Sequence, residues 1–153
     1  METRIATLND IKALCPLLTE FFTYNAGLQP LYNSEAVEDG EYPKIIIEGD
    51  NSDFLIAVDN GAVVGFIHIE QMKTQPYNSV VQHNYAEIIA FMVTASHRAH
   101  GVGTKLLDAA KEWSKERNLD YIELISMINA DDANLFYDKK GFKTVSYIRR
   151  QML

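Results

Sequence analysis

Cysteine is almost absent from this sequence of 153 residues, and Cys15 is its single example. One cysteine forms no disulfide within the chain and no cysteine-based metal cluster, so a reducing compartment is expected. No apolar run approaches the roughly 20 residues that a membrane helix needs, and the start of the chain lacks the apolar segment of an export signal. We therefore expect a cytoplasmic protein with no membrane partner.

Positive charge is also scarce, with 14 lysines and arginines against 21 aspartates and glutamates and a net charge of −7. This balance argues against a nucleic-acid partner held by basic patches. It suits a cationic substrate such as an amine, although acidity also serves solubility alone. No second histidine or carboxylate stands at a metal-ligand spacing from His83, so no metal site is expected.

The length and the apolar content of 47% predict a single domain over residues 1–153. In its first part, residues 3–7 alternate enough for a short strand. A helical pattern follows from Ile11 to Phe22, and Pro16 is expected to kink or divide that helix. Glycine and proline punctuate residues 31–53, which specify little beyond short helices, one capped by Ser34 and one at residues 43–48.

Two apolar runs, residues 54–58 and 62–70, flank Asn60-Gly61, which is a strong signal for a β-hairpin. Gly65 in the second run indicates a bulge or a close backbone approach. By the period of two, His68 and Glu70 share a face of that strand. Residues 71–85 form a long polar connection that is expected to overhang an acceptor site.

The chain is organised around residues 87–113. Ile88–Val93 is an apolar run short enough for a buried strand, and residues from Gly101 onward have the spacing of a helix with one buried face. A helix that starts at a glycine turn can bind an anion on its free N–H groups. The motif R-x-x-G-x-G in Arg98–Gly103 lacks the Gly-Lys-Ser/Thr ending of a P-loop, which argues against a nucleoside triphosphate held with magnesium. It also lacks the third glycine of the dinucleotide-binding fingerprint.

The last third predicts a strand at residues 121–127 and a helix that starts within Asn129–Asp132. That helix carries Phe136 and Tyr137 and ends at Gly141. Residues 142–152 are expected to form a final strand or a tight pair of strands.

Two of these segments carry a resemblance to a known family. Arg98–Gly103 matches the Q/R-x-x-G-x-G/A signature of the GNAT superfamily of N-acetyltransferases, and Phe136–Phe142, FYDKKGF, resembles that family's FYEKLGF segment. The order of elements also fits over nearly the whole chain. The resemblance implies an α/β fold with a mixed, mostly antiparallel central sheet, flanked by helices and with splayed central strands.

The resemblance also implies acetyl-CoA as co-substrate, with its pyrophosphate on the backbone of the glycine turn and its pantetheine arm along the preceding strand. Many family members carry asparagine in the first turn of the last helix, where this chain has Ala130 and Asp132; Asn129 and Asn134 are the candidate substitutes. The implied cofactor-binding residues are Phe91, Met92, Val93, Arg98, Ala99, His100, Gly101, Val102, Gly103, Thr104 and Asn134.

For catalysis, Tyr137 aligns with the tyrosine that the family uses to protonate the leaving sulfur; a core tyrosine is the alternative reading. Glu87 is the first candidate for the base, because it resembles a glutamate of the histone acetyltransferase branch in context and spacing. Desolvation at the edge of an apolar strand would raise its pKa, which suits a base, whereas a solvated residue at the strand start is the alternative. Glu123, Glu70 and His68 are the other candidates.

These residues predict an N-acetyltransferase that moves an acetyl group from acetyl-CoA to a primary amine by direct attack in a ternary complex. The acceptor is a small-molecule amine or a protein amine, and a homodimer is possible. The alternatives are a non-catalytic acyl-CoA-binding or interaction module on the same fold, and transfer of a longer acyl group.

Overall fold

The computed structural model describes residues 1–153. The elements in chain order are β1 (Glu2–Ile5), a 3-10 turn (Leu8–Asp10), α1 (Ile11–Leu28), α2 (Glu41–Glu48), β2 (Ser52–Asp59), β3 (Ala62–Lys73), β4 (Asn84–Val93), a second 3-10 turn (Ala95–His97), α3 (Val102–Glu116), β5 (Ile122–Leu124) and α4 (Asp131–Lys139). None of the helices has the length and apolar content required to cross a membrane.

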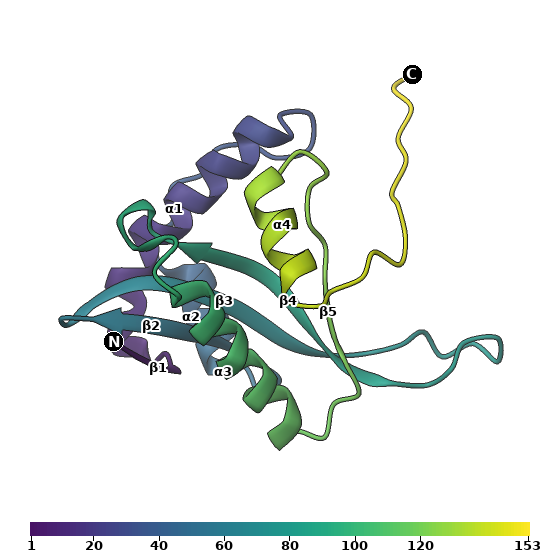
Figure 1. Ribbon diagram of the computed structural model, residues 1–153, viewed down its shortest axis with the longest axis horizontal. Helices are drawn as coiled ribbons and strands as arrows, with labels where there is room; N and C mark the ends of the chain where they lie inside the picture. Colours follow the sequence, from purple (N-terminus) through teal and green to yellow (C-terminus); the bar gives the residue numbers. More distant parts are fainter.

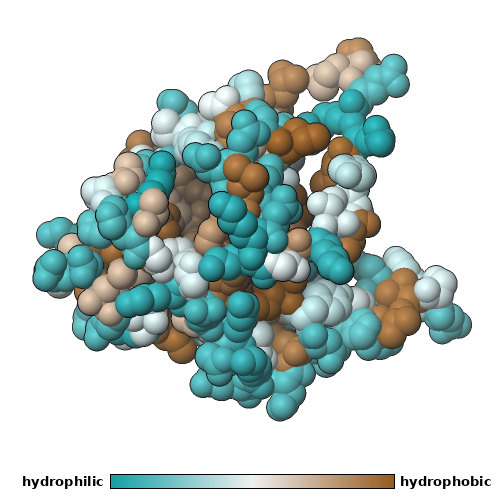
Figure 2. All heavy atoms as spheres, in the orientation of Figure 1, coloured by the Kyte–Doolittle hydropathy of each residue, from teal (hydrophilic) through white to brown (hydrophobic).

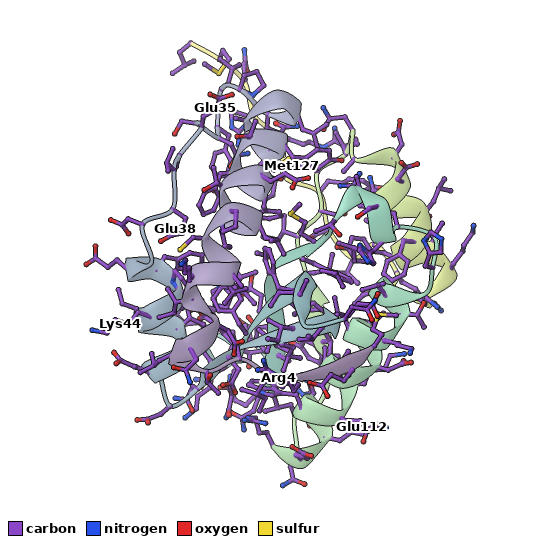
Figure 3. The ribbon with its side chains drawn as sticks, turned by 90° about the vertical axis from the view of Figure 1, so that its left-hand side faces the viewer. Arg4, Glu35, Glu38, Lys44, Glu112 and Met127 are labelled. Atoms are coloured by element: carbon purple, nitrogen blue, oxygen red, sulfur yellow. The ribbon has the colours of Figure 1, made fainter.

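The five strands form one sheet in the order β1-β2-β3-β4-β5, antiparallel except for the parallel pair β4–β5. Helices α1 and α2 cover one face and α3 covers the other, while α4 flanks the side where β5 ends (Figure 1). Figure 3 shows Lys44 on α2 and Glu112 on α3 on opposite sides of the molecule. The expected mixed, mostly antiparallel α/β fold is confirmed.

Each face of the sheet has its own apolar core. On the α3 side, Trp113 and Leu106 pack against strand residues such as Ile67. On the α1 and α2 side, Leu14 and Phe66 lie in a cluster rich in aromatic rings. The period-two alternation of the strands and the single apolar face of each helix account for this division.

The predicted hairpin between β2 and β3 is present. Asn60 and Gly61 both have positive φ, 48° and 80°, as a type I′ turn requires. The register shifts between Ala57 and Val58 opposite Gly65, which places a bulge there. A Cβ on Gly65 would lie 2.8 Å from the Met92 carbonyl oxygen, so this glycine also allows a close approach of β4.

Strands β4 and β5 pair only from Ala86–Ile122 to Ile88–Leu124, after which β4 continues to Val93 with β3 as its one partner. The β3–β4 register also shifts between His68 and Ile69, which leaves Ile89 as an extra residue on β4. The end of β4 therefore has a free edge beyond Ile88, and this opening is the splay that the fold was expected to contain.

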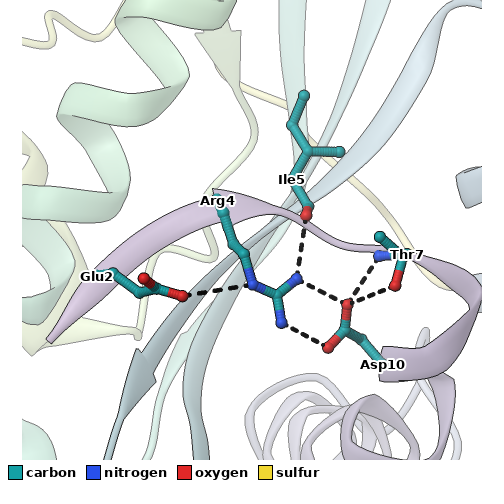
Figure 4. A network of polar contacts seen from close by, with 5 residues as sticks. All are labelled: Glu2, Arg4, Ile5, Thr7 and Asp10. Carbon is teal, nitrogen blue, oxygen red and sulfur yellow. Dashed lines mark hydrogen bonds and ion pairs between the residues drawn. The ribbon is translucent and has the colours of Figure 1, made fainter. Parts of the chain in front are cut away.

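A partly exposed ion pair joins β1 to the start of α1. The Arg4 guanidinium donates two hydrogen bonds of 2.8 Å to the Asp10 carboxylate, which also accepts the Thr7 N–H at 2.8 Å (Figure 4). Arg4 is the main reason that the pKa of Asp10 is lowered to about 2. Helix α1 then runs unbroken through Pro16 to Leu28, so the expected division at Pro16 is wrong. The proline lies in the second turn, and α1 keeps its packing on both sides of it.

The connection between α1 and α2 contains no helix at Ser34, in contrast to the expectation. It runs along the outside of α1, where Glu35 and Glu38 are labelled in Figure 3. The Glu38 N–H donates to the Thr19 hydroxyl at 3.0 Å and so fastens this connection to α1.

The end of the chain differs most from the expectation. Strand β5 has three residues instead of the seven predicted, and residues 143–153 form no strand and no backbone hydrogen bond. Figure 1 shows this C-terminal tail leading outward from the end of α4. The tail therefore has a strand-like sequence but no partner strand within its own chain.

Candidate active site

A cavity of about 810 Å³ opens at the free edge of β4. Its lining comes from the end of β4, the glycine turn (residues 98–104), α1 and α4, which meet around the splay. Figure 2 shows a recess of hydrophobic colour in this part of the surface. The lining residues are Glu20, Phe21, Tyr24, Phe91, Met92, Val93, His97, Arg98, Ala99, Gly101, Gly103, Thr104, Asp132, Ala133, Phe136, Tyr137, Lys139 and Lys140.

The glycine turn presents unpaired backbone donors to this cavity. Ala99 and Gly101 have positive φ, 61° and 82°, and Gly101 is the residue that precedes α3. The N–H groups of residues 99–104 form no hydrogen bond within the chain, and no side chain caps α3. Six such donors at the positive end of a 15-residue helix are suited to an anion of phosphate type.

Three cations stand near these donors. Arg98 is held in place by a 3.0 Å hydrogen bond from its Nε to the Val93 carbonyl oxygen, and Lys139 and Lys140 reach the cavity from the last turn of α4. The lysines were not among the predicted cofactor residues. The signal was available in the FYDKKGF segment, whose lysines lie one helical turn after Phe136 and face the same way. The three cations outnumber the two carboxylates of the lining, Glu20 and Asp132, in a chain that is acidic overall.

Tyr137 lies in the cavity, in a cluster of aromatic rings. Its ring centroid is 6.3 Å from that of Phe91 and 5.7 Å from those of Phe136 and Phe142. Burial, followed by the nearby Tyr24, raises the pKa of Tyr137 to about 12. The hydroxyl therefore keeps its proton at neutral pH and is able to donate it. Tyr24 and Phe21 line the same cavity from α1.

Glu87 lies outside the cavity, in a row of three carboxylates that crosses the sheet. It pairs in register with Glu70 on β3 and with Glu123 on β5, so the three side chains stand on one face. Glu87 has no hydrogen bond or ion pair within the chain. Its pKa is raised, first by burial and then by the charges of Glu123 and Glu70. We refer to Glu70, Glu87 and Glu123 as the carboxylate row.

His68 and Glu70 do share a face, as the period of two predicted. His68 is 2% exposed, and its Nε2 lies 2.9 Å from the Glu70 carboxylate while its Nδ1 is hydrogen-bonded to the Tyr42 hydroxyl. Burial lowers the pKa of His68 against the opposing effect of Glu70. A neutral ring with its proton on Nε2 satisfies both contacts, because it donates to Glu70 and accepts from Tyr42. His68 is therefore fully engaged and holds Glu70 in place.

Three predicted cofactor residues do not line the cavity. Val102 is 1% exposed and its side chain packs in the α3 core, while His100 is exposed outside the cavity. The Asn134 side chain accepts the Ser126 hydroxyl at 2.6 Å and donates to the Met127 carbonyl at 2.9 Å. Asn134 thus fastens the segment after β5 to α4.

The connection at residues 71–85, which was expected to overhang the acceptor site, is shorter than predicted because β3 extends to Lys73 and β4 begins at Asn84. None of its residues lines the cavity. Figure 1 shows this hairpin projecting beyond the sheet, away from α1 and α4.

Several proteins with related sequences are acetyltransferases. An uncharacterized N-acetyltransferase of Bacillus subtilis, YhdJ, is 35% identical over half of this chain, and a second from Methanocaldococcus jannaschii is 27% identical. The chain spans about half the length of these two relatives, 54% and 46%. The aminoalkylphosphonate N-acetyltransferase of Salmonella typhimurium is 26% identical, with 93% of this chain and 84% of that protein covered.

Solved structures share the fold at lower sequence identity. A variant of the BH1408 protein from Bacillus halodurans superposes with a TM-score of 0.93 and 20% identity, with both chains covered completely. An aminoglycoside N-acetyltransferase in complex with CoA gives a TM-score of 0.73 and 17% identity, with 99% of this chain and 93% of that chain covered.

The sequence model described as the acetyltransferase (GNAT) family matches residues 11–142, which include the glycine turn, the carboxylate row and Tyr137. The chain therefore belongs to the GNAT family of acetyltransferases.

Proposed function

We propose that this protein transfers an acetyl group from acetyl-CoA to a primary amine, by direct attack within a ternary complex. One observation carries the proposal: the glycine turn, whose N–H groups at residues 99–104 are unpaired and of which Ala99, Gly101, Gly103 and Thr104 line the cavity, shares that cavity with Tyr137. The first feature suits a pyrophosphate and the second suits a leaving thiolate. Together they serve the two ends of a single acyl-CoA molecule.

The residues present fit acetyl-CoA. The backbone donors of the glycine turn would hydrogen-bond the phosphates, and Arg98, Lys139 and Lys140 would balance their charge. The free edge of β4 at Phe91–Val93 would offer backbone groups to the pantetheine amides. The volume of about 810 Å³ lies within the range of small-molecule sites. Acetyl-CoA, when bound, supplies an activated thioester as the source of the acetyl group.

Glu87 is the proposed general base, because an ammonium ion has no lone pair with which to attack. Glu87 lies on β4 just before the free edge, which begins beyond Ile88, and a proton would pass from the amine to its carboxylate through water molecules. Its raised pKa brings it closer to neutral pH, where a base works best.

Tyr137 is the proposed general acid. Its pKa of about 12 leaves it protonated during turnover, and the phenol can pass its proton to the departing sulfur. Backbone N–H groups at Met92 or Val93 are the candidates to stabilise negative charge that develops on the carbonyl oxygen.

The carboxylate row supports a cationic acceptor. Three neighbouring carboxylates on one face attract a protonated amine and lower the cost of bringing it to the sheet. Two related proteins point the same way through their names, which state that they acetylate aminoalkylphosphonates and aminoglycosides. The proposal leaves a small-molecule amine and a protein amine as the two classes of acceptor.

The test is release of free thiol from acetyl-CoA with a panel of amines, for wild type and for Tyr137→Phe. We expect kcat to fall by on the order of 100-fold while the Kd of acetyl-CoA stays within about twofold. Tyr77→Phe, at an exposed tyrosine of the β3–β4 hairpin, is the matched control and should behave as wild type. Tight binding of acetyl-CoA without thiol release for any amine would overturn the proposal in favour of a non-catalytic acyl-CoA-binding module.

A further inference from the structure

His68 is a rare polar side chain in the interior, and aromatic neighbours hold its ring. It is 2% exposed and lies opposite Phe54 in the β2–β3 register, with the two rings stacked at a centroid distance of 5.1 Å. Tyr42 comes from α2, which lies against this face of the sheet (Figure 1), and packs edge-on to His68 with a centroid distance of 5.4 Å. Close packing against two rings keeps the imidazole in one orientation, so the directions of its nitrogens are fixed.

The Tyr42 hydroxyl determines which ring nitrogen of His68 carries the proton. Its one hydrogen-bond partner is His68 Nδ1. Burial, followed by the charge of Glu70, raises the pKa of Tyr42, so the phenol keeps its proton and donates the hydrogen bond to Nδ1. The ring proton then lies on Nε2, which is 2.9 Å from the Glu70 carboxylate. Glu70 therefore accepts a hydrogen bond from a buried donor of fixed direction.

The three members of the carboxylate row are held unequally. Glu70 and Glu87 are directly opposite each other in the β3–β4 register, and Glu123 follows on β5. Glu87 and Glu123 form no hydrogen bond or ion pair, whereas the Glu70 side chain, 31% exposed, contacts His68. No lysine or arginine forms an ion pair with the row. The other titratable groups around it are Tyr42, Tyr85, Tyr121 and, beside Tyr42, Glu38.

Two carboxylates that stand side by side without a cation do not both ionise easily, and one of them takes up a proton first. The member that accepts a hydrogen bond from a fixed donor is stabilised as the anion, so the proton goes to the other member. Here the donor on His68 is directed at Glu70, and Glu87 has none. In agreement, the pKa of Glu87 is raised by burial and by the charges of Glu123 and Glu70.

We propose that His68, oriented by Tyr42, is a positioning residue that keeps Glu70 ionised, so that Glu87 is the member of this pair that takes the proton of the acceptor amine. The inference rests on the proposed function for the fate of that proton. An N–H bond of the ammonium breaks and an O–H bond forms on Glu87 by way of water, which leaves a lone pair on nitrogen for attack on the thioester. Without the donor on His68, the two glutamates would share one proton, and Glu87 would be a poorer base.

Two substitutions at His68 separate positioning from packing. The amide N–H of Gln reaches about as far along the side chain as Nε2 does, whereas the amide of Asn ends near the place of Nδ1. Both substitutions remove the ring, so a purely structural role predicts equal effects from His68→Asn and His68→Gln. The positioning role predicts that only His68→Asn loses the hydrogen bond to Glu70.

Carbon NMR of the glutamate carboxyl groups, assigned with Glu70→Gln and Glu87→Gln, tests the proposal without turnover. As pH falls, the Glu87 carboxyl should take up its proton before that of Glu70 in the wild type and in His68→Gln. In His68→Asn the two carboxyls should titrate together. The order in the wild type is itself a test, so the proposal stays falsifiable even if His68→Asn fails to fold.

The kinetic readout is the dependence of kcat/KM on pH. His68→Asn should move the rise of kcat/KM to higher pH and lower its value at about pH 6 by on the order of tenfold, with the Kd of acetyl-CoA unchanged. Glu70→Gln should move the rise to lower pH, because the charge that opposes ionisation of Glu87 is gone. Adding His68→Asn to Glu70→Gln should cause no further shift. His83→Asn, at a histidine 2.7 Å from Asp120 and outside the cavity, is the matched control.

Uptake of the proton by Glu70 before Glu87, or by both together, in the wild type would overturn the proposal. Equal pH profiles for His68→Asn and His68→Gln would overturn it as well, because they would reduce His68 to a packing role. The expected titration order in a protein that releases no thiol with any amine would overturn the proposed function instead, and Glu70 would remain the ionised member of the pair.

Discussion

The glycine turn and the carboxylate row differ in how the chain builds them. The turn consists of consecutive residues, and its donors are backbone N–H groups whose direction is set by positive φ at Ala99 and Gly101. The row takes one residue from each of β3, β4 and β5, and its members meet only through strand register. The first site is local, and the second depends on the whole sheet.

This difference has a functional meaning within the proposed mechanism. A local backbone site binds a constant group such as a pyrophosphate and tolerates change in most side chains. A site assembled across strands from side chains changes its charge with a single substitution, so acceptor preference is easily altered there. Substitutions in the two regions should therefore affect different kinetic parameters.

The largest expected effect is in the row. Glu87→Gln should lower kcat/KM by on the order of 100-fold at neutral pH, because an amide cannot take a proton from the amine. The activity of wild type should rise with pH through the raised pKa of Glu87, and this rise should be absent in the variant. Glu116→Gln, at an exposed position of α3, is the control. An unchanged pH–rate profile for Glu87→Gln would exclude it as the base.

Both regions depend on a stable fold, and the ion pair between Arg4 and Asp10 contributes to that stability. The pKa of Asp10 is lowered to about 2, so its stabilisation is present above the ordinary carboxyl pKa and is lost as pH falls through about 2. Asp10→Asn should cost about 2 kcal/mol of unfolding free energy at neutral pH, and the loss should shrink as pH falls towards that value. Urea unfolding of the variant and of Asp138→Asn, an exposed control on α4, measures it. Equal losses at pH 7 and pH 2 would contradict the ion-pair explanation.

A smaller effect is expected in the turn. Gly101→Ala places a side chain at φ 82°, which costs about 1–2 kcal/mol of strain and should raise the Kd of acetyl-CoA about tenfold. The acceptor KM should stay nearly constant, since the row is untouched. Calorimetry with Gly27→Ala, a helical glycine without positive φ, supplies the control. A change in acceptor KM larger than the change in Kd would contradict the separation of the two regions.

The smallest effect should come from Glu123→Gln. Removing this charge takes away one of the repulsions that raise the pKa of Glu87, so the rise of activity with pH should move to lower pH. The maximal rate should change by less than about tenfold, because Glu123 takes no proton in the proposed mechanism. A pH–rate profile of kcat/KM measures both. Loss of activity as large as that of Glu87→Gln would instead make Glu123 the base.

The sequence predicted the local features well. The hairpin at Asn60-Gly61, the bulge near Gly65 and the helix that starts after Gly101 each depend on a few neighbouring residues, and each is present. The strand Ile88–Val93 was placed correctly within β4. These features are encoded by turn chemistry and periodicity, which act over short distances.

The features that depend on distant residues were not predictable in the same way. The extra residue Ile89 arises from the pairing of β3 with β4, and the alignment of Glu70 with Glu87 follows from that register. The burial of His68 against Tyr42 requires α2 to lie on the sheet. The unpaired tail could not be foreseen from periodicity, because its strand pattern is correct and only the partner is missing.

The most direct test of the proposed function follows an isotopically labelled acetyl group from acetyl-CoA into a cell extract that has been divided into protein and small-molecule fractions. Mass spectrometry locates the label after incubation with the protein. The mechanism predicts label on an amine nitrogen in one fraction, above a control without the protein and reduced by Tyr137→Phe. Label in neither fraction, from a protein shown by calorimetry to bind acetyl-CoA, would contradict it.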